Sequence, residues 1–246
     1  MSDRAALVTG ASSGIGLAVA RMLAQEGYAV TLAARRPQKL SEAYDELVDE
    51  AGFDVRQVAA DVSEEQDVAR LVAAHHDAFG RLDVLVNNAG IGIGMPIGEL
   101  STKRMDLQLA TNLRCIPLFY REALTMLTAA GAEHGNALVV NTASLAGKQG
   151  EAWLSVYSAT KFGVVGFTQS MNRELSSLGI KSTALCPSFV DTAMTEFVRE
   201  RISPEAMIQT SDIVAAVRML LALSPGCVVA EIVFQLPGGG QLDAMI

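Results

Sequence analysis

The chain has 246 residues, a formal net charge of −8 and a sequence pI of about 4.9. Because an acidic surface repels phosphate backbones and anionic lipid, this charge argues against nucleic acid and membrane surfaces as partners. Half of the residues are hydrophobic and only 5% are aromatic, which is typical of a large aliphatic core. This length suits one α/β domain, and we predict a single domain over residues 1–246.

Short apolar runs alternate with longer helical patterns along the chain. Continuous apolar runs are typical of buried parallel strands, and right-handed crossovers place helices on both faces of such a sheet. The pattern therefore predicts a Rossmann-type α/β fold with a doubly wound parallel sheet of about seven strands. The predicted strands are Ala5–Thr9, Ala29–Ala34, Val55–Ala60, Val84–Val86, Ala137–Asn141, Lys181–Leu185 and Val228–Phe234. The predicted helices are Gly14–Glu26, Pro37–Ala51, Glu64–Phe79, Thr102–Ala130, Trp153–Leu178 and Ser211–Leu223.

A glycine-rich segment, Thr9-Gly10-Ala11-Ser12-Ser13-Gly14-Ile15-Gly16, joins the first predicted strand to the first predicted helix. Glycine allows a tight turn and a close backbone approach to a pyrophosphate, while the helix N-terminus offers free N–H groups to the anion. The spacing differs from the usual GxGxxG, so an ordinary glycine-rich turn is the alternative. The flanking strand and helix favour a dinucleotide site.

The second predicted strand ends in Ala34-Arg35-Arg36-Pro37. A site selective for NAD usually has a carboxylate at this point, whereas an NADP site has an arginine for the 2′-phosphate. Three cations (Arg35, Arg36 and Lys39) also lie at a helix N-terminus, whose dipole prefers anions. This arrangement predicts NADP(H) over NAD(H), with a solvated basic turn as the alternative.

Tyr157 and Lys161 are four residues apart in a helical segment and therefore share one face. A neighbouring ammonium favours the phenolate, so we expect Lys161 to lower the pKa of Tyr157. Tyr157 would then exchange a proton with a substrate oxygen, and Ser144 at the end of the fifth strand would hydrogen-bond the same atom. A lone YxxxK pattern is common on helix surfaces, so the pair needs other motifs beside it.

Those motifs occur in one order and spacing over nearly the whole chain, and together they resemble the short-chain dehydrogenase/reductase family. They are the glycine loop from Thr9 to Gly16, Asp61-Val62, Asn87-Asn88-Ala89-Gly90, Asn112, Ser144 and Tyr157 with Lys161. The resemblance implies four catalytic residues, Asn112, Ser144, Tyr157 and Lys161. In it, Asn112 fixes a water that links Lys161 to solvent.

The same resemblance implies a set of cofactor-binding residues. Asp61 contacts the adenine with Val62 packed beside it, and Lys161 also holds the nicotinamide ribose. The full set is Thr9, Gly10, Ser12, Ser13, Gly14, Ile15, Gly16, Arg35, Arg36, Asp61, Val62, Asn88, Ala89, Gly90, Tyr157, Lys161, Pro187, Val190 and Thr192.

One position departs from the family pattern. The chain has Pro187-Ser188 where the family commonly has Pro-Gly, and Ser188 fits only if the backbone there tolerates a Cβ. By resemblance Val190 and Thr192 meet the nicotinamide carboxamide, so this departure concerns that contact and leaves the catalytic assignment unchanged.

The predicted substrate loops are Ile91–Gly98, Leu145–Trp153 and Thr192–Ile208, which by resemblance follow strands four, five and six. Their side chains suit a modest hydrophobic substrate or simply cap the core. The apolar residues are Ile93, Met95, Leu145, Trp153, Phe189, Met194 and Phe197, and the polar exceptions are Lys148, Gln149 and Glu151.

The predicted function is hydride transfer between NADP(H) and a small carbonyl or alcohol substrate. The first alternative is a 3-oxoacyl reductase acting on carrier-bound or CoA-bound acyl groups. It is disfavoured because no Lys or Arg lies between Arg121 and Lys148 to meet an acidic carrier. A non-catalytic NADP-binding regulator is the second alternative, disfavoured because it has no use for the intact catalytic set.

Further expectations concern metals, location and assembly. We predict no metal site, because the histidines lack metal-ligand spacing, and we expect His75 and His76 to face solvent. Three scattered cysteines and the absence of a signal peptide or membrane span indicate a cytoplasmic protein. The two longest predicted helices and the resemblance imply a homo-oligomer, a dimer or tetramer, and Pro117 should kink or interrupt the first of these helices.

Overall fold

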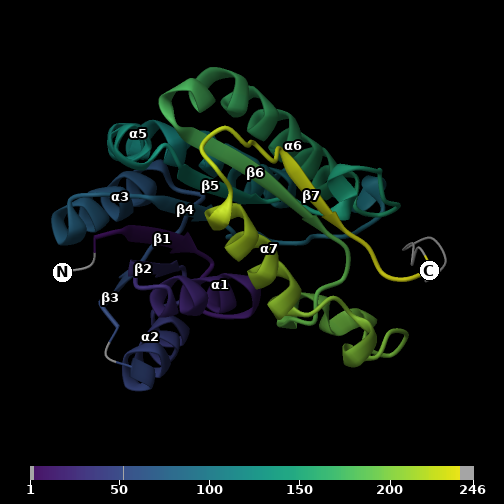
Figure 1. Ribbon diagram of the computed structural model, residues 1–246. Coiled ribbons are helices and arrows are strands. Elements are labelled where there is room, and N and C mark those ends of the chain that lie inside the picture. The colour runs from purple at the N-terminus through teal and green to yellow at the C-terminus, as the bar shows by residue number, and fades with distance from the viewer. Residues whose placement is uncertain (1–2, 52, 239–246) are drawn as a thin grey trace.

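The computed structural model describes residues 3–51 and 53–238. Seven strands, all paired in parallel, form one sheet in the order β3-β2-β1-β4-β5-β6-β7, which confirms the predicted doubly wound fold (Figure 1). The strands are β1 (Ala5–Thr9), β2 (Ala29–Ala34), β3 (Val55–Ala59), β4 (Val84–Asn87), β5 (Ala137–Thr142), β6 (Ile180–Pro187) and β7 (Glu231–Phe234). The α-helices are α1 (Gly14–Gln25), α2 (Pro37–Ala51), α3 (Glu65–Phe79), α4 (Thr102–Leu109), α5 (Cys115–His134), α6 (Ser155–Leu175) and α7 (Thr210–Ala222).

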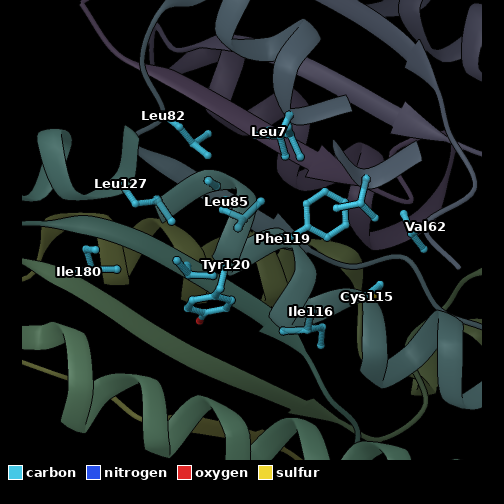
Figure 2. Packing of buried hydrophobic residues seen from close by; sticks show 14 of the residues in the cluster. Leu7, Val62, Leu82, Leu85, Cys115, Ile116, Phe119, Tyr120, Leu127 and Ile180 are labelled. Atoms are coloured by element: carbon cyan, nitrogen blue, oxygen red, sulfur yellow. The ribbon is translucent and has the colours of Figure 1, made fainter. Parts of the chain in front are cut away.

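The sheet has a hydrophobic core on each face. One core joins the sheet to α3, α5 and α6, and Figure 2 shows part of it, with Phe119 and Tyr120 from α5 packed near Leu85 of β4. The other core joins the sheet to α1, α2 and α7. β1, β2, β4 and β6 are buried along their whole length, as expected for central strands covered on both faces.

Strand order places a crevice at the carboxyl end of β1. β1 pairs with β2 on one side and with β4 on the other, so the chain moves outward in opposite directions from this strand. Connections that leave a sheet toward opposite faces open a gap between them, where α/β proteins bind ligands. The sequence motifs at the ends of β1, β4, β5 and β6 therefore meet at one edge of the sheet.

The expected interruption near Pro117 is present, as a π-helical turn at Ala110–Arg114 between α4 and α5. Pro117 has no N–H to donate to the carbonyl of Leu113, and its ring would clash with the preceding α-helical turn. Just before it, the N–H of Cys115 donates to the carbonyl of Ala110, five residues back. The wider turn contains Asn112, which is buried.

Most other boundaries shift by at most two residues, but α5 continues to His134 rather than ending at Ala130, and β7 begins at Glu231 rather than Val228. The predicted helix over Trp153–Leu178 begins only at Ser155, because Trp153 has a φ of +64°, outside the helical region. It ends at Leu175, and a 3-10 turn covers Ser176–Leu178.

In the part of the chain that the structure describes, no helix is both long and apolar enough to cross a bilayer.

The expectation that His75 faces solvent is wrong. His76 is exposed, but the ring of His75 is buried between α3 and the sheet. Its Nδ1 lies 2.8 Å from Oγ1 of Thr31, and its Nε2 lies 2.9 Å from the carbonyl oxygen of Arg81. The carbonyl can only accept, so Nε2 carries the proton and Nδ1 accepts from the Thr31 hydroxyl. Neutral His75 thus links α3 to β2.

This burial predicts an acid-sensitive contribution to stability. Burial lowers the pKa of His75 to about 4, so between pH 6.5 and 4 the unfolded chain takes up a proton that the folded chain does not. The free energy of unfolding should fall by up to about 3 kcal/mol over this window. Urea unfolding at pH 7.5 and pH 4.5 measures the effect. His75→Gln should remove this part of the pH dependence, while the control His76→Gln should keep it. Equal pH dependence in both variants would contradict the assignment.

Candidate active site

A cleft of about 1080 Å³ lies at the carboxyl ends of the strands. Most of the residues predicted for the cofactor and for catalysis line it together. These are Gly10, Ser12, Ser13, Gly14, Ile15, Arg35, Arg36, Asp61, Val62, Asn88, Ala89, Gly90, Ser144, Tyr157, Lys161, Pro187, Val190 and Thr192. The remaining three, Thr9, Gly16 and Asn112, do not line the cleft but contact residues that do.

The glycine loop depends on residues without a Cβ. Gly10 and Gly14 have φ values of +64° and +55°, which side chains other than glycine rarely adopt. Gly16 is fixed by packing instead, because a Cβ on it would lie 2.4 Å from the carbonyl oxygen of Gly10. The first turn of α1 thus sits directly against the loop, and its residues Gly14 and Ile15 line the cleft, where the free N–H groups of a helix N-terminus suit an anion.

Thr9 joins the glycine loop to the end of β4. Its Oγ1 accepts hydrogen bonds from the backbone N–H groups of Asn88 (2.9 Å) and Ala89 (3.0 Å), and donates to the carbonyl of Val86 (3.2 Å). Nδ2 of Asn88 returns a bond to the carbonyl of Thr9 at 3.2 Å. One wall of the cleft is thereby tied to the other through side chains that are themselves satisfied.

The basic residues after β2 are accessible to an external anion. Arg35 and Arg36 are exposed and line the cleft. The nearest described carboxylate to Arg35 is Asp61, at 3.9 Å between Nη1 and Oδ2. That separation is too long for a hydrogen bond. Asp61 instead accepts from the backbone and hydroxyl of Ser63, at 3.0 and 2.7 Å.

Tyr157, Lys161 and Ser144 meet at the middle of the cleft. Lys161 is only 5% exposed, its Nζ donates to the carbonyl of Thr142 at 2.7 Å, and it stands 5.6 Å from the centre of the Tyr157 ring. Oγ of Ser144 accepts from the backbone N–H of Ala146 at 3.2 Å. The phenol, the ammonium and the hydroxyl thus converge from α6 and the end of β5.

The expected lowering of the Tyr157 pKa is not found. Burial raises the pKa of Tyr157 above its ordinary value, and hydrogen bonding with Ser144 opposes this without reversing it. Burial also lowers the pKa of Lys161 to about 8, so its positive charge is itself disfavoured. Desolvation is therefore the largest influence on both groups, and the protonated phenol is favoured.

Asn112 has a neighbour that sequence reasoning missed. Oδ1 of Asn112 accepts from the N–H of Ile91, and Nδ2 donates to the carbonyl of the same residue, both at 2.8 Å. Gln108, four residues earlier and fully buried, accepts from the N–H of Ile93 at 2.7 Å. The side-chain amides of Asn112 and Gln108 thus hold the loop after β4. Their i, i+4 spacing is visible in the sequence and was the signal that pairs Gln108 with Asn112.

The concern over Ser188 is answered by its backbone. Trp153 is the only non-glycine residue with positive φ in the described part of the chain, so Ser188 adopts a conformation that accepts a Cβ. Its N–H donates to the carbonyl of Phe234 at 3.0 Å, which ties the segment to β7. Farther along, the side chain of Thr192 approaches Gly14, since a Cβ on Gly14 would lie 3.1 Å from the Thr192 methyl.

The substrate loops contribute unequally to the cleft. Of the apolar residues predicted for this end, Leu145, Trp153, Phe189, Met194 and Phe197 line it, whereas Ile93 and Met95 do not. Of the polar exceptions only Glu151 lines it, and Lys148 pairs with a carboxylate of β7 instead.

Comparisons with known proteins agree with this geometry. The family described as short chain dehydrogenase matches residues 4–203. A protein of Streptomyces virginiae assigned as a ketoacyl reductase of the monensin polyketide synthase is 41% identical over 81% of this chain and 75% of its own length. Another of Streptomyces coelicolor, assigned as a ketoacyl reductase, is 40% identical over 96% of this chain and 90% of its own.

A solved structure is similar over almost the whole fold. A variant of actinorhodin polyketide ketoreductase, determined with NADPH, superposes with a TM-score of 0.84 at 36% sequence identity, covering 96% of each chain. The match over residues 4–203 and the identity of these relatives show that the chain belongs to the short-chain dehydrogenase family.

Proposed function

We propose that the protein is an NADP(H)-dependent oxidoreductase that transfers a hydride between the nicotinamide and a carbonyl or alcohol carbon. The observation that carries the proposal is the meeting of Tyr157, Lys161 and Ser144 in the same cleft as the glycine loop. A binding module would have no use for a phenol, an ammonium and a hydroxyl placed in this way, which argues against a non-catalytic regulator.

The residues of the cleft fit a dinucleotide phosphate. A Cβ on Gly10 would lie 2.9 Å from Nδ2 of Asn88, and one on Gly14 would lie 3.1 Å from the Thr192 methyl, so this loop beside the first turn of α1 accepts only glycine and leaves its backbone open to a phosphate. Arg35 and Arg36 are exposed and not held by a close carboxylate, which suits a 2′-phosphate. When bound, the nicotinamide supplies or accepts the hydride. The solved ketoreductase relative was determined with NADPH, which supports the same choice.

The chain's own residues would handle the proton and the developing charge. During reduction, Oη of Tyr157 donates its proton to the substrate oxygen, and Oγ of Ser144 donates a hydrogen bond to the same atom. The raised pKa of Tyr157 keeps the phenol protonated for this step. Lys161 would hold the ribose, and Asn112 would fix the water behind it.

The substrate is a carbonyl compound with an apolar body, since Leu145, Phe189 and Phe197 line its end of the cleft. Small free ketones are the first class. A second class, 3-oxoacyl thioesters, is favoured by the two relatives assigned as ketoacyl reductases, one of them of a polyketide synthase. Assays with NADPH against free ketones, 3-oxoacyl-CoA and carrier-bound 3-oxoacyl groups separate the two classes.

We further propose that residues 1–246 act as one dinucleotide-binding domain that contains its own substrate loops. The continuous sheet supports this. We also propose a cytoplasmic protein, because Cys115, Cys186 and Cys227 are all free thiols. Detection of the protein in cell fractions checks the location.

Replacing the proposed proton donor should remove chemistry alone. Tyr157→Phe keeps the ring but should lower turnover by about 10²–10⁴-fold while NADPH binding survives. Lys161→Ala should harm both turnover and NADPH binding. Steady-state kinetics and fluorescence titration measure the two quantities, and Tyr44→Phe, outside the cleft, is the control. Reduction by the unmodified enzyme should hold through neutral pH and fall in alkaline buffer as the phenol ionises. An unchanged rate in Tyr157→Phe would refute the role.

Arg35 should set the choice of nucleotide. Loss of a charge-assisted hydrogen bond to the 2′-phosphate costs about 1.5–3 kcal/mol, so Arg35→Ala should weaken NADPH binding by about 10- to 150-fold. NADH binding should change little, because NADH lacks that phosphate. Titration of both nucleotides tests this, with Lys103→Ala as the control, since Lys103 is exposed but does not line the cleft. Equal affinities for NADPH and NADH in the unmodified protein would contradict it.

We propose a homo-oligomer, a dimer or tetramer, built through α5 and α6. Leu124 on α5 and Phe162 on α6 are large apolar side chains left 38% and 46% exposed, as a self-complementary interface would need. Light scattering at micromolar concentration should show a dimer or tetramer, and Phe162→Glu should shift it toward monomer. The control Met219→Glu, on α7, should not. A monomer in the unmodified protein overturns the proposal.

A further inference from the structure

Glu151 is a carboxylate in the substrate end of the cleft to which the proposed chemistry gives no role. It lies in the loop between β5 and α6, lines the cleft and is only 8% exposed. Its backbone is fixed by the start of α6, because its N–H donates to Oγ of Ser158 and its carbonyl accepts from the N–H of Leu154, both at 3.2 Å. The same turn of helix carries Tyr157, so both residues are held in one frame.

The carboxylate of Glu151 accepts fewer hydrogen bonds than its two oxygens allow. Oε1 accepts one hydrogen bond, from Nε2 of Gln149 at 2.8 Å. Oε2 has no hydrogen-bond partner among the described residues and is not sealed off by protein atoms, so it remains accessible. A carboxylate offers about four acceptor positions, and buried ones are normally paired. Here the nearest basic residue in sequence, Lys148, is already bound to Glu231 at 2.9 Å.

The surroundings of Glu151 make this acceptor selective. Leu145, Trp153 and Phe189, which line the same cleft, are apolar, so their side chains offer this carboxylate no donor. Glu200 and Arg201 also line the cleft, but both are exposed at their positions. Among the described residues that line the cleft, Glu151 is therefore the one buried carboxylate.

We propose that Glu151 determines substrate specificity by accepting a hydrogen bond from an O–H or N–H donor on the substrate, beyond the reacting carbonyl. The inference rests on the proposed carbonyl reduction. A site built to hydrogen-bond a substrate group discriminates against analogues that lack the group, because its own polar atom is then left unpaired. A hydroxyl or an ammonium meets the requirement, and a substrate carboxylate at the same place is rejected by charge.

A matched set of ketones tests the proposal. The set has one carbon skeleton ending in a methyl, a hydroxyl, an ammonium or a carboxylate group, and kcat/KM is measured with NADPH. The unmodified enzyme should prefer at least one donor-bearing ketone over the methyl ketone by about tenfold or more. Glu151→Leu should lose this preference while it still reduces the methyl ketone. Glu151→Gln separates the two donors, because its neutral amide oxygen still accepts from a hydroxyl but loses the attraction for an ammonium.

Glu200→Gln is the matched control, since it neutralises an exposed carboxylate on the same cleft and should leave the preference unchanged. NADPH titration and thermal unfolding confirm that each variant is folded. The proposal is overturned if the unmodified enzyme treats methyl and donor-bearing ketones alike, or if Glu151→Leu keeps the preference.

Calorimetric binding of the same ketones to the enzyme with NADP⁺ separates this inference from the proposed function. In one outcome the enzyme binds the donor-bearing ketones preferentially, Glu151→Leu abolishes this preference, and no ketone is turned over. This outcome would refute the reductase proposal and support the role of Glu151. Turnover of all four ketones with no preference in rate or binding would support the reductase proposal and overturn the role of Glu151.

Discussion

The approach of α1 to β1 at the glycine loop is the constraint on which the rest of the site depends. A Cβ on Gly16 would lie 2.4 Å from the carbonyl oxygen of Gly10, so this spacing exists only because Gly16 lacks a side chain. The close approach brings the first turn of α1 to the carboxyl end of β1. Thr9, the first residue of the loop, then ties that end to β4, and the cleft wall follows from these bonds.

Desolvation decides the electrostatics of the catalytic group. Lys161 is nearly enclosed, and its ammonium is held by the carbonyl of Thr142 rather than by a carboxylate. Its pKa falls to about 8 while that of Tyr157 rises, so both groups move toward their neutral forms. An argument from charge proximity alone fails here, because it counts the attraction between the two groups and ignores the water that both have lost.

The sequence was sufficient for features set by local pattern and insufficient for those set by packing. Continuous apolar runs predicted the strands, and the missing N–H of Pro117 predicted the interruption before α5. The burial of His75 was not foreseen, because its partners Thr31 and Arg81 lie on other elements. The form of the interruption, a π-helical turn, likewise depends on how the helix meets its neighbours. Glycines and arginines of the nucleotide end were found because their roles follow from backbone geometry and charge.

Unlike the nucleotide end, the substrate end of the cleft takes its shape from loops that contact one another. Trp153 holds a φ of +64°, which is costly for a bulky side chain, by about 1–3 kcal/mol. Its carbonyl accepts from the N–H of Met95 at 2.7 Å, so the loop after β5 is bonded to the loop after β4. The latter is itself held by Asn112 and Gln108. Trp153 is therefore held in place despite its backbone strain, and the turn that contains Trp153 also contains Glu151. Trp153 and Glu151, which both line the cleft, therefore lie on a loop that is bonded to its neighbour rather than on a free loop.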